Sequence, residues 1–185
     1  VSFDAGLASA FEGLHVYELD RATDVPGGEF PDPLSPFHAV SQEPGVNGVC
    51  VLCDVVNPEF SVDGDPDNYT ELNAPLGVVS GIWQDLIFPF GGLNGDIIEV
   101  EIGVGGGLAD LSLLGGLTLE SFNGETANGD GISLEETINI ELVPGTTDRY
   151  IASFIAGADF DRVRVKFAAV LEALTNVRVY GARLR

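Results

Sequence analysis

Short segments in which apolar and polar residues alternate, separated by glycine and proline turns, constrain the fold of this chain most strongly. In residues 161–167 (DRVRVKF), apolar side chains alternate with Arg162, Arg164 and Lys166. A period of two is typical of a strand with one buried and one exposed face. Strands are predicted at Ile97–Ile102, Leu117–Asn123, Ile138–Val143, Arg149–Ile155, Asp161–Phe167 and Asn176–Arg183. The chain has 24 glycines and 10 prolines, which favour turns between these strands. We therefore predict an all-β protein, a jelly-roll-like β-sandwich.

The two ends of the chain resemble each other. Residues 1–21 (VSFDAGLASAFEGLHVYELDR) echo residues 165–185 (VKFAAVLEALTNVRVYGARLR) with one residue of slack. A repeat spaced by about one domain length is typical of modules that are stacked or polymerised with copies of themselves. The alternative is that two unrelated amphipathic strands share common β residues.

Charge is distributed unevenly along the chain. It has 8 basic and 29 acidic residues, a formal net charge of −21, yet six of the basic residues lie in the last 24 positions. The acidity argues against nucleic acid and anionic membranes as partners, because both require a basic surface. No apolar run approaches the roughly 20 residues that span a bilayer.

Because opposite charges stabilise paired strands, the acidic N-terminal and basic C-terminal ends of neighbouring copies are suited to meet. Alternatively, the basic strands lie inside their own acidic sheet.

The chain divides into three predicted segments. Residues 1–21 form an N-terminal strand, residues 22–46 a proline-rich connector and residues 47–185 the β-sandwich domain. The connector contains five prolines, which favour an extended conformation. A strand held on such an arm has the geometry required for addition to a neighbouring sheet edge. The alternative is an ordered loop that lies over its own domain.

An acidic turn is the one candidate metal site. Residues 61–72 (SVDGDPDNYTEL) place Asp63, Asp65 and Asp67 at alternate positions, with Glu71 close behind. Calcium prefers clustered carboxylate and carbonyl oxygens, so calcium is the predicted cofactor. The segment is not an EF-hand loop, which requires glycine at the sixth position. The alternative is a solvated acidic turn held by side-chain hydrogen bonds to its own backbone.

Cys50 and Cys53 form a C-x-x-C motif. A zinc site is not expected, because zinc needs four ligands and the chain has two histidines and no second cysteine pair. In an exported all-β chain we predict a short-loop disulfide, with buried free thiols as the alternative. Export is itself an expectation, based on a chain that begins at Val1 and contains no methionine.

Motifs for catalysis are scarce, and we expect a non-catalytic protein. The sequence contains no nucleophile elbow and no phosphate-binding glycine loop. Its carboxylates are numerous enough to form a glycosidase pair, but no particular pair stands out. Sugar binding would use aromatic stacking platforms, for which Trp83 and Tyr69 are the candidates. Trp83 shares a strand face with Asp85, and the alternative for Trp83 is a place in the core.

Several segments resemble known families. The residues from Cys50 to Asn73, followed by LADLSLLGGLTLESFNG, FDRVRVKF and NVRVYG, resemble modules found in tandem in large bacterial cell-surface proteins and adhesins. This resemblance covers residues 46–185, and it implies that residues 1–21 are the last strand of a preceding copy. VDGDPDNYTEL resembles the turn of discoidin-type, galactose-binding-like domains. That resemblance implies a β-sandwich, with Asp63 and Asp65 matching a motif that binds a structural calcium; some members bind sugar and others are only adhesive.

These observations favour two functions. The leading hypothesis is a non-catalytic extracellular or cell-surface structural subunit that assembles head to tail with its own copies, forming filaments by strand addition. Its predicted interface consists of Phe3, Leu7, Leu14, Val16, Arg162, Arg164, Lys166 and Arg178. The alternative is a carbohydrate-binding or adhesin module of a tandem-repeat cell-surface protein, which would bind a glycan through Trp83 and Tyr69.

Overall fold

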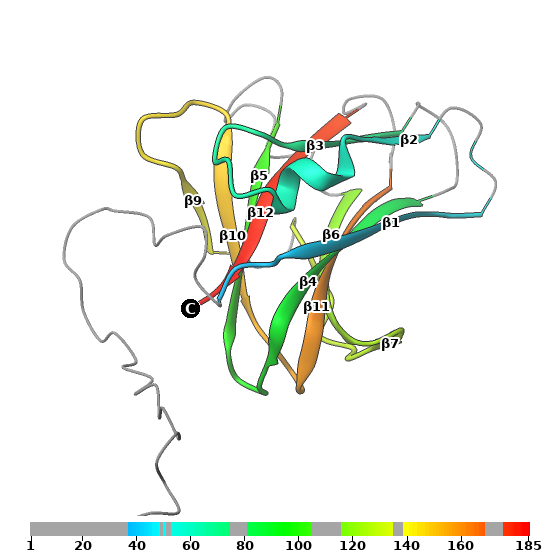
Figure 1. The fold of residues 1–185 in the computed structure, drawn as a ribbon, viewed down its shortest axis with the longest axis vertical. Coiled ribbons are helices and arrows are strands. Elements are labelled where there is room, and N and C mark those ends of the chain that lie inside the picture. The colour runs from blue at the N-terminus through cyan, green and yellow to red at the C-terminus, as the bar shows by residue number, and fades with distance from the viewer. Residues whose placement is uncertain are drawn as a thin grey trace, which may run out of the picture. The chain divides into compact units, whose positions relative to one another are not determined.

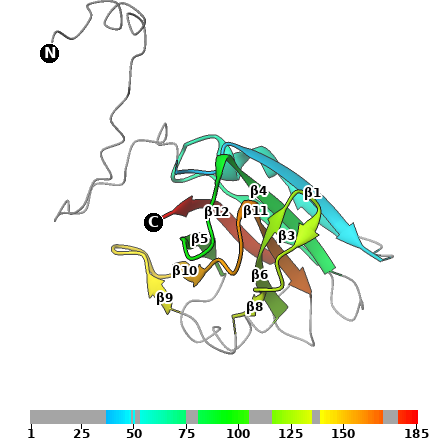
Figure 2. The same ribbon diagram turned by 90° about the horizontal axis from the view of Figure 1, so that it is seen from below.

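The computed structural model describes residues 37–48, 50, 53–74, 81–104, 116–134, 139–168 and 176–185. Two antiparallel sheets pack face to face in this part of the chain (Figures 1 and 2). The prediction of an all-β sandwich is therefore confirmed. No helix among the described residues is long and apolar enough to cross a membrane.

Sheet I has the strand order β1-β4-β11-β6-β7, with β8 also paired to β6. Its strands are β1 (Ser41–Asn47), β4 (Gly81–Gly92), β6 (Leu117–Asn123), β7 (Thr126–Ala127), β8 (Ile132–Ser133) and β11 (Phe160–Ala168). The long strands β4 and β11 form the centre of this sheet.

Sheet II has the strand order β2-β3-β12-β5-β10-β9. Its strands are β2 (Asp54–Val56), β3 (Thr70–Asn73), β5 (Ile97–Gly103), β9 (Asn139–Leu142), β10 (Arg149–Ile155) and β12 (Asn176–Leu184). A short 3-10 helix, η2 (Pro58–Val62), links β2 to the acidic turn before β3. In both sheets, the central neighbouring strands come from distant parts of the sequence, such as β4 beside β11 and β12 beside β5.

The six strands predicted from alternation are present. Two of them, β6 and β10, have the predicted ends, and each of the others differs by one residue at one or both ends. Residue 138 lies outside the described part of the chain. Alternation locates these strands well because each buries one face in the same core.

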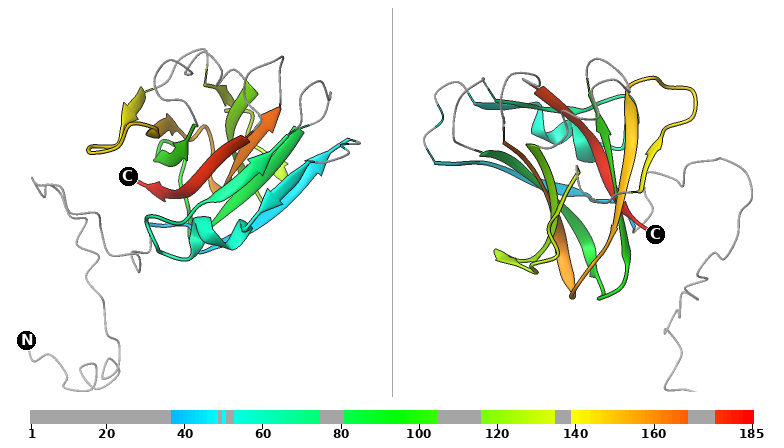
Figure 3. Two further views of the ribbon diagram at one scale, coloured as in Figure 1. Left: turned by 90° about the horizontal axis from the view of Figure 1, so that it is seen from above. Right: turned by 180° about the vertical axis from the view of Figure 1, so that it is seen from behind.

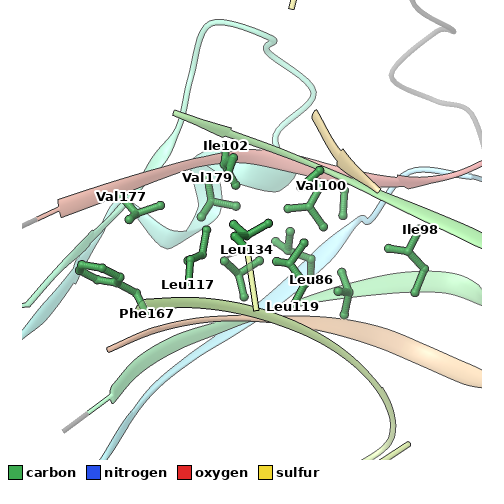
Figure 4. Packing of buried hydrophobic residues seen from close by; sticks show 14 of the residues in the cluster. Leu86, Ile98, Val100, Ile102, Leu117, Leu119, Leu134, Phe167, Val177 and Val179 are labelled. Carbon is green, nitrogen blue, oxygen red and sulfur yellow. The ribbon is translucent and has the colours of Figure 1, made fainter. Parts of the chain in front are cut away.

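The core lies between the sheets and is filled by aliphatic and aromatic side chains from both (Figure 4). Sheet I contributes Leu86, Leu117, Leu119 and Phe167, and sheet II contributes Ile98, Val100, Ile102, Val177 and Val179. Each of these side chains is almost completely buried. Since neighbours along each strand point the opposite way, the polar residues between them lie on the two outer faces.

Strand β1 begins at Ser41, inside the range assigned to the connector. Pro44 lies at the middle of β1 and weakens the sequence signal for a strand, because proline lacks an N–H donor. β1 pairs only with β4 in the described structure, and an edge position tolerates proline. The predicted N-terminal strand, with Phe3, Leu7, Leu14 and Val16, lies outside the described residues.

Candidate functional site

The outer face of sheet II gathers aromatic and basic side chains that are far apart in the sequence. Tyr69 precedes β3, Arg149 opens β10, and Arg178 and Tyr180 lie on β12. We call these four residues the tyrosine–arginine cluster. β3, β12, β5 and β10 are neighbours in sheet II in this order. Figure 3 shows the sheet from two further directions, with β12 in red and β5 in green.

A bulge in β12 positions Tyr180. Val179 pairs with Ile102, but the next pair is Gly181 with Glu101, so Tyr180 is an extra residue in the ladder. Such bulges re-aim side chains. The Tyr180 ring lies across Gly103 of β5, where an added Cβ would come within 2.9 Å of Tyr180 Cε2. An alanine at position 103 would therefore force the Tyr180 ring to shift from its place against the sheet.

Arg149 holds the Tyr180 ring in place. Its guanidinium carbon lies 3.8 Å from the centroid of the ring. Arg149 Nε donates to Glu101 Oε1 at 2.7 Å, and Nη2 donates to the carbonyl oxygen of Pro66 at 2.6 Å. With 15% of its side chain exposed, Arg149 is a largely buried, well-anchored positioning residue.

Tyr69 and Arg178 form the other half of the cluster. The Tyr69 and Tyr180 rings are 5.3 Å apart and inclined by 56°. The Arg178 guanidinium lies 4.8 Å from the centroid of Tyr69, and its Nη1 is 3.5 Å from Asp148 Oδ2. About a third of each of these two charged side chains is exposed, 32% for Arg178 and 37% for Asp148. Arg178 also makes a hydrogen bond with the Tyr180 side chain, and because arginine has five N–H donors, these contacts do not engage all of them.

The hydroxyl of Tyr180 is a hydrogen-bond donor over a wide pH range. Burial raises the pKa of Tyr180 above its ordinary value, although Arg149 and Arg178 act in the opposite direction. The phenol is therefore neutral at physiological pH. The cluster thus offers aromatic rings, a phenolic O–H, guanidinium N–H groups and a carboxylate acceptor on one surface.

Trp83 lies on the opposite face of the sandwich. It points outward from β4 together with Asp85, as predicted, while the intervening Gln84 is buried in the core. The guanidinium of Arg164 on β11 lies 3.7 Å from the centroid of Trp83 and 4.3 Å from that of Phe122. We call Trp83, Arg164 and Phe122 the tryptophan–arginine cluster. The two predicted stacking residues are Trp83 on β4 of sheet I and Tyr69 directly before β3 of sheet II, so they lie on opposite sides of the sandwich and cannot contact one sugar.

The basic residues assigned to the assembly interface are divided between the two outer faces. Arg162 Nε donates to Asp161 Oδ1 at 2.9 Å, and Arg164 donates two hydrogen bonds to Asp85. Arg178 lies on sheet II. These contacts agree with the alternative in which the basic strands lie within their own acidic sheet. Head-to-tail assembly stays a prediction.

The acidic turn is organised by hydrogen bonds to its own backbone. Asp63 Oδ1 accepts from the N–H of Asp65 at 2.9 Å, and Asp65 Oδ1 accepts from the N–H of Asp67 at 3.0 Å. Asp67 also lies 3.6 Å from Arg149, and Glu71 pairs in register with Arg178.

Among the described residues, no group of three His, Cys, Asp or Glu side chains is arranged to hold a metal. Calcium binding stays a prediction from the sequence.

Cys50 and Cys53 form a disulfide, with their Cα atoms 5.5 Å apart. The predicted short-loop disulfide is confirmed. The bridge closes the segment that leads into β2.

Comparisons with known proteins give a distant structural likeness. No protein-family model matches the chain, and no curated protein matches it. A mutant of a family 29 carbohydrate-binding module is similar in structure, with 11% identity, a TM-score of 0.37, and coverage of 78% of this chain and 92% of that one. Another family 29 carbohydrate-binding module structure has 12% identity, the same TM-score, and coverage of 78% and 90%. A likeness this distant carries no ligand site over to this chain.

Of this cluster, the sequence predicts Tyr69 as a stacking residue and Arg178 as part of an assembly interface, and it does not single out Gly103, Arg149 or Tyr180. Glycine directly after Tyr180, inside an alternating strand, is a signal for a bulge. Gly103, at the end of an apolar strand, is similarly typical of a close approach between backbone and side chain. No local signal places Arg149 beside Tyr180, because that contact depends on the order of strands in sheet II.

Proposed function

We propose that this chain is a non-catalytic carbohydrate-binding module of an extracellular protein and that it binds a glycan at the tyrosine–arginine cluster. One observation carries the proposal: the β12 bulge places Tyr180 beside Tyr69, next to the partly exposed Arg178 and Asp148. Ligand sites typically combine an apolar surface with a few polar groups that fix orientation.

Each part of the cluster has a role in this proposal. The C–H face of a sugar ring packs on the aromatic surface of Tyr69, which contributes both area and defined geometry. Arg178 donates hydrogen bonds to sugar hydroxyls, and Asp148 accepts them. Arg149, whose polar atoms are already engaged, keeps the Tyr180 ring in position. A site whose groups are fixed before binding loses less conformational entropy on binding.

Affinity electrophoresis tests the proposal. Gels containing hydroxyethylcellulose, soluble xylan, laminarin or galactomannan would be used to measure retardation of the full chain. Tyr69→Ala should weaken binding to the retarding polysaccharide about tenfold, since loss of aromatic stacking costs about 1.4 kcal/mol. Gly103→Ala should weaken binding as well, because its Cβ displaces Tyr180. Tyr69→Phe should retain most of the affinity, since it keeps the ring.

Phe90→Ala is the matched control for loss of an aromatic ring. Phe90 is 83% exposed and lies near the end of β4, in sheet I. Its removal should leave retardation unchanged. Wild-type retardation of both Tyr69→Ala and Gly103→Ala, or no retardation of the wild-type protein by any of the four polysaccharides, would show that the proposed function is wrong.

A further inference from the structure

The outer face of sheet I repeats the construction of the tyrosine–arginine cluster. In sheet II the Tyr180 ring lies across the strand glycine Gly103. In sheet I the indole of Trp83 lies across Gly45 of β1, and a Cβ at Gly45 would overlap the ring. In both sheets, therefore, a glycine on a neighbouring strand makes room for a partly exposed aromatic ring on an outer face.

The guanidinium groups of the two clusters are also anchored alike. Arg149 lies 3.8 Å from the Tyr180 centroid and is bound to Glu101. Arg164 lies 3.7 Å from the Trp83 centroid, and its Nε and Nη2 donate to the two oxygens of Asp85 at 2.6 and 2.8 Å. Asp85 is fully buried, so this bidentate pair fixes both the guanidinium and the indole beside it.

Lys166 supplies an uncommitted donor beside Trp83. It is the only lysine of the chain, and it pairs in register with Trp83 across β4 and β11. Its stem crosses Gly81, where an added Cβ would lie 2.9 Å from Lys166 Cε. Lys166 is the one basic side chain on the outward face of β11 that makes no ion pair within the described part of the structure. Its three N–H donors are therefore available to a ligand at the indole.

We propose that the tryptophan–arginine cluster, together with Lys166, is a second glycan-binding site and that the module bridges two glycan chains. This inference rests on the proposed function, because it assigns the same class of ligand to a similarly constructed surface. The two sites lie on opposite outer faces with the core between them, so occupation of one leaves the other accessible. Two sites on one rigid body raise avidity for a surface that displays many glycan chains, and they cross-link soluble chains.

Intrinsic fluorescence distinguishes the two sites, since Trp83 is the only tryptophan of the chain. Titration of the wild-type protein with the same four polysaccharides should shift or quench tryptophan emission with each one that retards the protein. Gly103→Ala should show this emission change at an unchanged midpoint while its retardation decreases. Gly45→Ala and Lys166→Gln should lose at least about tenfold in the emission midpoint, the loss expected for about 1.4 kcal/mol. Lys166→Gln leaves both Gly45 and the indole of Trp83 unchanged. A loss of binding in this variant therefore reports on the ligand contact and not on folding.

Cross-linking gives an independent measurement. The wild-type protein should make a solution of a retarding polysaccharide turbid, whereas Gly103→Ala and Lys166→Gln should each abolish turbidity while keeping one functional site. Polysaccharide binding without any change in tryptophan emission, or turbidity that survives Lys166→Gln, would overturn the second site and leave the first intact. Absence of retardation for the wild-type protein would instead overturn the proposed function, and the second site with it.

Discussion

At the scale of single residues, Asp85 is the most deeply buried charged side chain in the described part of the chain. It is fully buried, accepts two hydrogen bonds from Arg164 and lies 3.5 Å from Arg162. A buried ion pair gains little over an apolar pair, but loss of one partner leaves the other charge desolvated and unpaired. Asp85 is thus a point at which a small change should affect the whole fold.

We expect Asp85→Ala to lower the free energy of unfolding by about 3–5 kcal/mol, measured by urea denaturation. The pair of Asp148 with Arg178, in which about a third of each side chain is exposed, provides the control. Asp148→Ala should cost about 1 kcal/mol or less, because exposed pairs are solvated in the folded and unfolded states alike. Equal losses for the two variants would contradict the view that burial of Asp85 makes its pairing indispensable.

His38 provides a residue-scale prediction about pH. Its pKa lies below the ordinary value of 6.5, because burial disfavours the imidazolium and Arg183 repels it. The folded protein therefore binds this proton less readily than the unfolded chain does. Stability from the neutral imidazole is fully present above pH 6.5 and is lost as the pH falls toward the folded pKa.

Thermal unfolding of the wild-type protein and of His38→Gln at pH 7.5 and pH 5.5 should show this effect as a difference between the two proteins. Relative to the wild-type protein, His38→Gln should lose less stability between these two values, because glutamine does not titrate. The comparison between proteins removes the contribution of the many carboxylates. An identical pH dependence for both proteins would show that His38 does not contribute.

At the scale of secondary structure elements, Gln84 connects the two sheets. It points from β4 into the sandwich and is fully buried. Its Nε2 donates to the carbonyl oxygen of Pro58 at 2.7 Å, to Ser61 Oγ at 3.0 Å and to Thr70 Oγ1 at 3.2 Å. One amide therefore ties η2 and β3 to sheet I, close in sequence to the acidic turn and Tyr69.

Gln84→Leu should lower the free energy of unfolding by about 1–3 kcal/mol, because buried acceptors lose a donor. Gln42→Leu is the matched control. The Oε1 of each glutamine is buried without a hydrogen-bond partner among the described residues, but Gln84 also donates to η2 and β3, so replacement of Gln42 should cost less. Urea denaturation of both variants measures the difference, and a larger loss for Gln42→Leu would contradict the tie between the sheets.

Some of these strands are easier to predict from the sequence than others. Strands such as β6 and β10 are evident because alternation records a single buried face. β1 is obscured by Pro44, which an edge strand tolerates. The outward direction of Trp83 and Asp85 also follows from alternation. The separation of Trp83 from Tyr69, and the approach of Arg149 to Tyr180, depend on strand order, and no local pattern encodes that order.

At the scale of the whole molecule, net charge is the dominant property. With 29 acidic and 8 basic residues, the chain carries a formal charge of −21. Such an excess favours solubility and destabilises the compact state through repulsion among carboxylates. Salt screens this repulsion, since the Debye length falls from about 30 Å at 0.01 M to about 3 Å at 1 M. Salt also weakens the ion pairs of the outer faces, but exposed pairs contribute little.

Repulsion should therefore outweigh the loss of ion pairs, and the melting temperature should rise with sodium chloride. Between 0.01 and 0.5 M we expect a gain of about 1 kcal/mol, which corresponds to about 2–4 °C for a chain of this size. Calcium chloride at matched ionic strength is the informative comparison. Screening alone predicts equal stabilisation by both salts, whereas calcium held by Asp63, Asp65 and Asp67 would add a further increase that Asp63→Asn removes. A melting temperature that falls with sodium chloride would mean that solvent-accessible ion pairs such as Arg178 with Asp148, rather than net charge, control the stability of the sandwich.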